Sequence, residues 1–153
     1  MNIQASLLDR LIDNDPGASH EPVQYRLSSF RNIKEAVGRD LENLLNTKNY
    51  VSSLCSEYQE LNSSLFVYGL PDFTSTNPKN PAVRHKLRQE LEKAIALFEP
   101  RLRNVTVRVE EAGSDERNLR FKINALLYLA PALEPVVFDT FFDVNRCEYS
   151  IAK

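Results

Sequence analysis

The chain has 153 residues, of which 42% are apolar and 26% charged, and its formal net charge at pH 7 is −2. These values are typical of one soluble globular domain that can bury its own core, and they exclude an intrinsically disordered chain. Acids and bases alternate along the sequence, so it has no basic stripe of the kind that binds nucleic acid. Its apolar runs are too short to cross a bilayer, and we therefore expect neither nucleic-acid binding nor membrane insertion.

Residues 1–20 are predicted to form an amphipathic segment and a linker that precede a single domain over residues 21–153. The breaker-rich stretch "NDPGASHEP" supplies the linker. Four apolar residues of "SLLDRLID" share one helical face: Leu7, Leu8, Leu11 and Ile12. A helix this short is marginal alone in water, so we expect it to dock, either on its own domain or on another protein. The N-terminus lacks the basic start and long apolar stretch of a signal peptide, which predicts a cytoplasmic protein.

Two long amphipathic helices are predicted. Ser28 or Ser29 can cap the first, whose apolar stripe has a period of three to four residues: Phe30, Ile33, Val37, Leu41, Leu44 and Leu45. The second begins at Asn80 and Pro81, which suit the cap and the first helical position, and it must end at or before Glu99, because Pro100 follows. Its stripe is formed by Val83, Leu87, Leu91, Ala94, Ile95 and Phe98.

Residues 50–80 separate these two helices and contain several breakers. We predict a long structured connection, of the kind that is often functional. An apolar run is expected to pin it to the core: Leu65, Phe66, Val67, Tyr68 and Leu70.

After Pro100 the apolar period changes from that of a helix to that of a strand. Val105, Val107 and Val109 alternate with polar residues, and residues 119–129 repeat that alternation. Pro131 and Pro135 are expected to break the run, before a third strand over residues 136–143 and a fourth over residues 147–151. The predicted fold class is therefore α+β, with two main helices packed on one face of a mostly antiparallel C-terminal sheet, plus the short N-terminal amphipathic helix.

The sequence carries no recognisable catalytic constellation. Its four glycines are isolated, and neither His20 nor His85 lies in a ligand-spaced cluster or beside a nucleophile. Glu99 and Glu134 can be drawn as a glycosidase pair, but acids next to proline commonly lie at solvated corners. We expect no enzyme, no cofactor, no metal and no small-molecule substrate.

Cys55 and Cys147 are the only cysteines. A single disulfide between them is one alternative. Free thiols are favoured, because two cysteines in a chain without a signal peptide seldom form a disulfide framework.

The charged corner Glu99-Pro100-Arg101 is unusual for the end of a helix. Proline ends the helix and stiffens its exit, but an acid at a helix C-terminus opposes the macrodipole. Glu99 therefore needs a cationic counterpart, which is Arg101, Arg103 or a group on another molecule. The corner is either a helix stop with a local ion pair or a rigid polar knuckle that presents its charges to a partner.

Five segments in register resemble the TssE family, the baseplate wedge component of bacterial type VI secretion systems. The segments are "SLLDRL", "IKEAVGRDLENLLNT", "YGLPD", "IALFEPRLRNVTV" and "LRFKINALL". The resemblance covers nearly the whole chain, and residues 50–64 are its least similar part. The family is homologous to a small baseplate protein of contractile-tailed phages, which has been labelled lysozyme-like.

The resemblance implies a non-enzymatic subunit, assembled in the cytoplasm on a membrane-docked baseplate. It implies that Glu99, Pro100 and Arg101 contact the helical core bundle of the wedge, formed by TssF and TssG. It also implies that the terminal strands initiate polymerisation of the TssB/TssC sheath. The residues concerned are Val144, Cys147, Glu148, Tyr149 and Ile151. A C-terminal edge strand agrees with this, because its unpaired N–H and C=O groups can be completed by a partner strand.

Two other functions are weighed against this one. A stand-alone anti-adapter regulator has the same fold and a similar corner, but it lacks the "SLLDRL" segment and the full "DLENLLNT" match. A peptidoglycan hydrolase is a remote alternative that depends only on the inherited lysozyme label.

Overall fold

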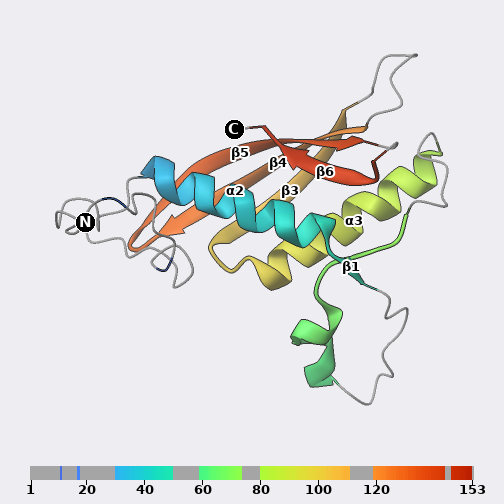
Figure 1. Ribbon diagram of the computed structural model, residues 1–153, viewed down its shortest axis with the longest axis horizontal. Helices are drawn as coiled ribbons and strands as arrows, with labels where there is room; N and C mark the ends of the chain where they lie inside the picture. Colours follow the sequence, from blue (N-terminus) through green and yellow to red (C-terminus); the bar gives the residue numbers. More distant parts are fainter. Residues whose placement is uncertain are drawn as a thin grey trace.

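The computed structural model describes residues 11, 17, 30–49, 59–73, 80–110, 119–143 and 146–152. Within them the fold is α+β, as predicted, with two long helices and a four-stranded antiparallel sheet (Figure 1). The predicted N-terminal segment and linker lie outside the described residues except for Leu11, which is helical and exposed, and Gly17, which lies in a turn. The Ser28 or Ser29 cap and the sheath residue Val144 also lie outside them. None of the described helices is both long and apolar enough to span a membrane.

Helix α2 spans Phe30–Asn46 and follows the predicted apolar stripe. Five aliphatic residues of this stripe are buried: Ile33, Val37, Leu41, Leu44 and Leu45. Phe30 is the exception, since 42% of its surface is exposed at the start of the helix. The helix lies across the sheet (Figure 1), and these buried side chains belong to the core.

Helix α3 spans Pro81–Phe98 and begins as its sequence indicates. The Asn80 side chain accepts a hydrogen bond from the Ala82 N–H at 2.9 Å, and Pro81 occupies the first helical position, where no N–H is needed. Its inward face buries Leu87, Leu91, Ala94 and Ile95. Together with α2 it covers one face of the sheet, so the core lies between the helices and the strands (Figure 1).

The main sheet has the order β3-β4-β5-β6, and all neighbours are antiparallel. Its strands are β3 (Leu102–Glu110), β4 (Leu119–Leu129), β5 (Ala132–Asp143) and β6 (Glu148–Ile151). The predicted alternation in β4 is confirmed, because every second residue from Phe121 to Leu129 is buried against the helices. The register of β3 shifts between Arg103 and Thr106, where Asn104 adopts a left-handed conformation with φ of 53°. This is a β-bulge at the start of the edge strand.

Strand β5 begins earlier than predicted, and the expected break at Pro135 is wrong. Pro135 lies inside β5 opposite Leu126 of β4. The strand tolerates it because β6 pairs only with Thr140–Asp143, so β5 is an edge strand at Pro135. Proline has no N–H to donate, and at a free edge none is required.

The connection between the helices is only partly pinned to the core. It contains two short 3₁₀ helices, η2 (Gln59–Ser63) and η3 (Leu65–Val67), and strand β2 (Leu70–Pro71), which pairs in parallel with β1 (Lys48–Asn49). Leu70 is buried and Tyr68 packs against the core, as predicted. Leu65 and Phe66 do not, because 83% and 63% of their surfaces are exposed.

Gly69 fixes the path of this connection beside α2. Its φ is 106°, and a Cβ atom built there would lie 2.4 Å from the Thr47 carbonyl oxygen. The same oxygen accepts a hydrogen bond from the Leu70 N–H at 2.8 Å. Only glycine permits this close backbone approach, which holds the preceding residue, Tyr68, against the end of α3.

Candidate functional site

The Glu99-Pro100-Arg101 corner is a tight turn between α3 and β3. The Glu99 N–H donates to the Ile95 carbonyl at 2.9 Å and so closes the helix. The Leu102 N–H donates to the Glu99 carbonyl at 3.0 Å, which closes the turn around the proline. The Tyr128 N–H donates to the Arg101 carbonyl at 2.8 Å, so the turn is also tied to β4. Three backbone hydrogen bonds therefore fix the conformation of the corner.

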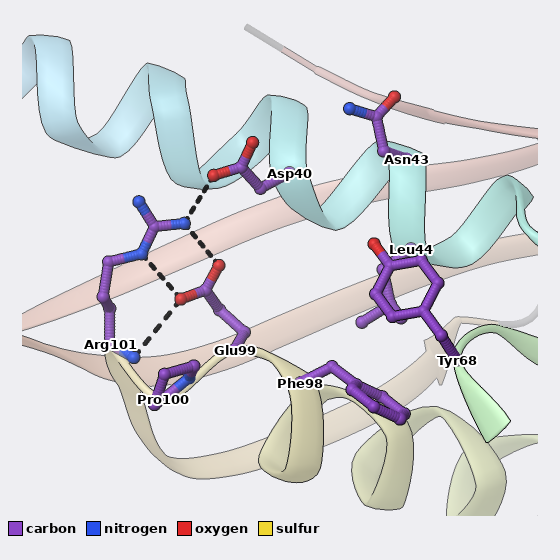
Figure 2. Close-up of a pocket in the computed structure, with 8 residues that line it drawn as sticks. All are labelled: Asp40, Asn43, Leu44, Tyr68, Phe98, Glu99, Pro100 and Arg101. Atoms are coloured by element: carbon purple, nitrogen blue, oxygen red, sulfur yellow. Dashed lines mark hydrogen bonds and ion pairs between the residues drawn. The ribbon is translucent and has the colours of Figure 1, made fainter. Parts of the chain in front are cut away.

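The side chains of the corner are paired inside the molecule (Figure 2). Glu99 Oε1 accepts hydrogen bonds from Arg101 Nε at 2.7 Å and from the Arg101 backbone N–H at 3.2 Å. Arg101 Nη2 donates to Glu99 Oε2 at 2.5 Å and to Asp40 Oδ2 of α2 at 2.6 Å. The counterpart of Glu99 is thus Arg101, one of the candidates that the sequence suggested.

Of the two alternatives for the corner, the local ion pair is present, and the outward presentation of both charges is wrong for Glu99. Only 4% of Glu99 is exposed, because its carboxylate turns back under the corner to meet Arg101. This pairing also explains an acid at a helix C-terminus, since the guanidinium compensates for the unfavourable dipole. Hydrogen bonding to Glu99, followed by that to Asp40, outweighs burial and raises the pKa of Arg101, which stays charged. Whether the corner binds a partner remains a prediction.

Beside the corner lies a hollow of about 360 Å³, to which α2, Tyr68 and the end of α3 contribute. We call it the corner hollow, and eight residues line it: Asp40, Asn43, Leu44, Tyr68, Phe98, Glu99, Pro100 and Arg101 (Figure 2). Leu44 and Glu99 are buried, whereas Asn43 and Pro100 are exposed. The rings of Tyr68 and Phe98 meet edge to face, with centroids 5.1 Å apart. The hollow is preformed, because packing and ion pairs within the domain fix its lining.

Asp40, Asn43 and Tyr68 were not predicted as site residues. Asp40 lies 61 positions from Arg101 in the sequence, and no local pattern announces a pair at that separation. In the sequence Asp40 is one charged residue among several on α2, next to the buried Leu41. Tyr68 was expected in the core, and the structure places it at the edge of the core, where it lines the hollow.

The predicted sheath-binding strand β6 is a sheet edge, but it is not bare. Asn46, at the end of α2, makes two hydrogen bonds to Tyr149: its Oδ1 accepts from the Tyr149 N–H at 2.8 Å, and its Nδ2 donates to the Tyr149 carbonyl at 2.9 Å. The expectation of unpaired backbone groups is therefore wrong at Tyr149. The Asn46 amide occupies the position that a partner strand would take.

The side chains of β6 divide between the core and the surface. Tyr149 is buried, and its ring centroid lies 4.6 Å from that of Phe142. Burial raises the pKa of its hydroxyl. Glu148 is exposed, Ile151 is half-buried, and Cys147 adopts a left-handed conformation with φ of 54° before the strand. Cys147 is half-buried, and because Cys55 lies outside the described residues, the favoured free thiols stay a prediction.

The opposite edge of the sheet is capped in a similar way. The Val107 N–H of β3 donates to Glu92 Oε1 of α3 at 2.9 Å. Each helix therefore supplies one polar side chain to the sheet edge next to it. Such caps oppose unwanted strand pairing.

Glu99 and Glu134, the two acids considered as a glycosidase pair, have different surroundings and do not form such a pair. Glu99 is buried and bonded to Arg101, while Glu134 is exposed on β5, so the solvated-corner prediction fails for Glu99. Among the residues that the structure describes, no group of three or more His, Cys, Asp or Glu side chains could hold a metal ion.

Comparisons with known proteins identify the family of the chain. The sequence profile of the baseplate wedge protein gp25 family matches residues 31–132, which include α2 except its first residue, then α3, β3, β4 and the whole corner. A comparison with curated proteins finds no match. One solved structure that the chain resembles belongs to "The baseplate complex from the type VI secretion system". It has a TM-score of 0.50 and 19% sequence identity over 72% of this chain and 94% of that one, a likeness that concerns the fold. Because the family profile covers two thirds of the sequence and contains the corner, the chain belongs to the baseplate wedge protein gp25 family.

Proposed function

We propose that this chain is the TssE-type subunit of a type VI secretion baseplate, with a structural and non-enzymatic role. It works in the cytoplasm on the membrane-docked baseplate, joins the TssF/TssG wedge through the corner, and initiates the TssB/TssC sheath at its terminal strands. Membership in the baseplate wedge family supports the structural role. The observation that carries the wedge contact is the rigid corner with the preformed hollow beside it.

The pairing inside the corner favours recognition by shape over recognition by two free charges. Buried and half-buried ion pairs fix the positions of Pro100 and the Arg101 side chain before any partner arrives. A site that is already ordered loses little conformational entropy on binding. A wedge joint must hold a fixed angle, and such a site supplies one.

The exposed 3₁₀ segment η3 extends this surface. Leu65 and Phe66 come directly before the chain reaches Tyr68 in the hollow. Large apolar side chains with this exposure are typical of contact surfaces. We propose that the wedge partner covers them together with the hollow.

The sheath contact is proposed for the exposed side of β6 and the part of β5 that β6 leaves without a neighbour among the described strands. Strand addition there would run past the Asn46 amide and replace its two hydrogen bonds to Tyr149. Ile151 and Glu148 flank this position and offer side-chain contacts to the incoming strand.

Charge reversal at Arg101 is a poor test of the wedge contact. A glutamate there would meet the carboxylates of Glu99 and Asp40, and the domain itself would lose stability. Asn43→Trp is better, because Asn43 is exposed at the mouth of the hollow and the tryptophan ring would block it. We expect this variant to keep its thermal unfolding temperature and to lose co-purification with co-expressed TssF and TssG.

The matched control is Glu35→Trp, two turns earlier on the exposed surface of α2. It should co-purify with TssF and TssG like the unmodified protein. If Asn43→Trp binds as well as this control, the corner is only a helix stop. Failure of the unmodified protein to bind TssF and TssG would refute the proposed function as a whole.

A further inference from the structure

The corner hollow carries more negative than positive charge. Its lining contains two carboxylates, Asp40 and Glu99, and one guanidinium, Arg101, so its formal charge is −1. Arg39 approaches the other oxygen of Asp40, at 3.8 Å, but it does not line the hollow and its side chain is 42% exposed. Solvent screens that contact more strongly than the pairs at the corner.

The negative field reaches the opposite wall of the hollow. The pKa of the Tyr68 hydroxyl is raised, first by burial and then by the charges of Asp40 and Glu99. Figure 2 shows this hydroxyl turned toward α2, across the hollow from the ion pairs. Asn43 lies on the same rim. The charged groups of the hollow are therefore the two carboxylates and, at one end, Arg101, while Tyr68 and Asn43 are neutral groups that can donate or accept hydrogen bonds.

Arg101 is a weak attractor for an acidic group despite its charge. Its guanidinium already donates to three carboxylate oxygens, two of Glu99 and one of Asp40. A second acid placed in the hollow would face those same carboxylates at close range, which is unfavourable. A cation would face them with the opposite sign.

The remaining walls fit a side chain with an apolar stem and a cationic head. Leu44, Phe98 and Pro100 supply apolar surface for methylene groups. Tyr68 and Phe98 supply aromatic rings, which attract a lysine or arginine head by cation–π interaction. The volume of about 360 Å³ lies at the small end of the range of ligand pockets, which suits one side chain.

We infer that the corner hollow receives a lysine or arginine side chain of the wedge partner, held by the Asp40–Glu99 carboxylates and the Tyr68–Phe98 rings. The identity of that partner rests on the proposed function, whereas the cationic chemistry rests on the lining of the hollow. The corner would then act as a socket for a basic residue, and Arg101 would position the two carboxylates.

The test introduces a charge of either sign at Asn43, which is neutral and exposed on the rim. We expect Asn43→Asp to tighten binding to the purified TssF–TssG complex by roughly threefold to tenfold, and Asn43→Lys to weaken it by roughly tenfold or more. Gln89→Glu and Gln89→Lys, on the exposed side of α3, make the same charge changes away from the hollow and should leave the affinity unchanged. The opposite order, tighter with lysine and weaker with aspartate, would overturn the inference, as would no difference between the two.

A second measurement separates the inference from the proposed function. If the unmodified protein does not bind TssF–TssG, the proposed function fails, and arginine amide is then titrated into the isotope-labelled protein. Shifts of the Tyr68, Phe98 and Asn43 resonances that exceed those caused by glutamate support a cationic socket. Shifts that are equal, larger with glutamate, or absent at these residues overturn it.

Discussion

The corner after α3 and the edge strand β6 are the two regions that the sequence marks as contact surfaces, and in both the available groups are used within the domain. At the corner, Arg101 pairs with Glu99 and with Asp40 at 2.5 to 2.7 Å. At the edge, the backbone of Tyr149 pairs with the Asn46 amide at 2.8 and 2.9 Å. The first region uses charges, and the second uses one neutral amide.

This difference separates a rigid surface from an exchangeable one. Breaking the ion pairs of the corner leaves a buried carboxylate without its cation, which costs roughly 3–5 kcal/mol. A partner therefore has to fit the corner as it is. Replacing the Asn46 amide by a peptide strand exchanges hydrogen bonds of the same kind, so little energy is lost. We therefore expect the corner to act as a fixed joint and β6 to open when a strand arrives.

The largest expected effect is at the corner. Glu99→Gln removes the charge that faces Arg101 while it keeps the size of the side chain. Because Glu99 is buried and Arg101 keeps only Asp40, the free energy of unfolding should fall by about 2–4 kcal/mol. Urea denaturation followed by circular dichroism measures this change.

Glu35→Gln is the matched control for that experiment. Glu35 pairs with Arg31 at 2.8 Å on the solvated side of α2, where water and salt screen the interaction. We expect no measurable change in the urea midpoint. If both variants lose the same stability, the corner is not the rigid region that its ion pairs indicate.

The sequence predicted what is periodic and missed what is long-range. The stripe of α2 and the alternation of β4 are local patterns, so they indicated the element type and the buried face directly. The pairing of Asn46 with Tyr149 spans 103 positions, and nothing in the local pattern at either residue requires it. Pro135 was read as a break because its neighbourhood alone does not show that β6 is too short to reach it.

The apolar run 65–70 shows a further limit of sequence patterns. Hydrophobic character predicts that a side chain is buried, but it does not tell whether the side chain packs against its own chain or against a partner. Leu70 packs into the core, while Leu65 and Phe66 remain exposed. A run that is divided in this way fits a segment that joins a core to a contact surface.

The next effect in size concerns the edge. Asn46→Leu keeps the length of α2 and removes both hydrogen bonds to Tyr149, which should lower the free energy of unfolding by about 1–2 kcal/mol. Hydrogen exchange of the Tyr149 amide should accelerate. Asn43→Leu, one turn earlier and exposed, should leave that exchange rate unchanged. Equal exchange rates in Asn46→Leu and the unmodified protein would show that the amide is not what covers the edge.

The smallest effect is expected at Thr140, in the part of β5 that pairs with β6. Only 1% of this residue is exposed, and its hydroxyl has no hydrogen-bond partner among the described residues. It lies opposite Ile151 in β6, on the buried face of β5. Thr140→Val replaces the hydroxyl with a methyl group of similar size and leaves no donor behind, so stability should stay the same or rise by about 1 kcal/mol. If the free energy of unfolding, measured by heat or urea, falls by more than about 1 kcal/mol, the hydroxyl has a hydrogen-bond partner. Polar groups at this edge would then be held more tightly than a single exchangeable amide implies.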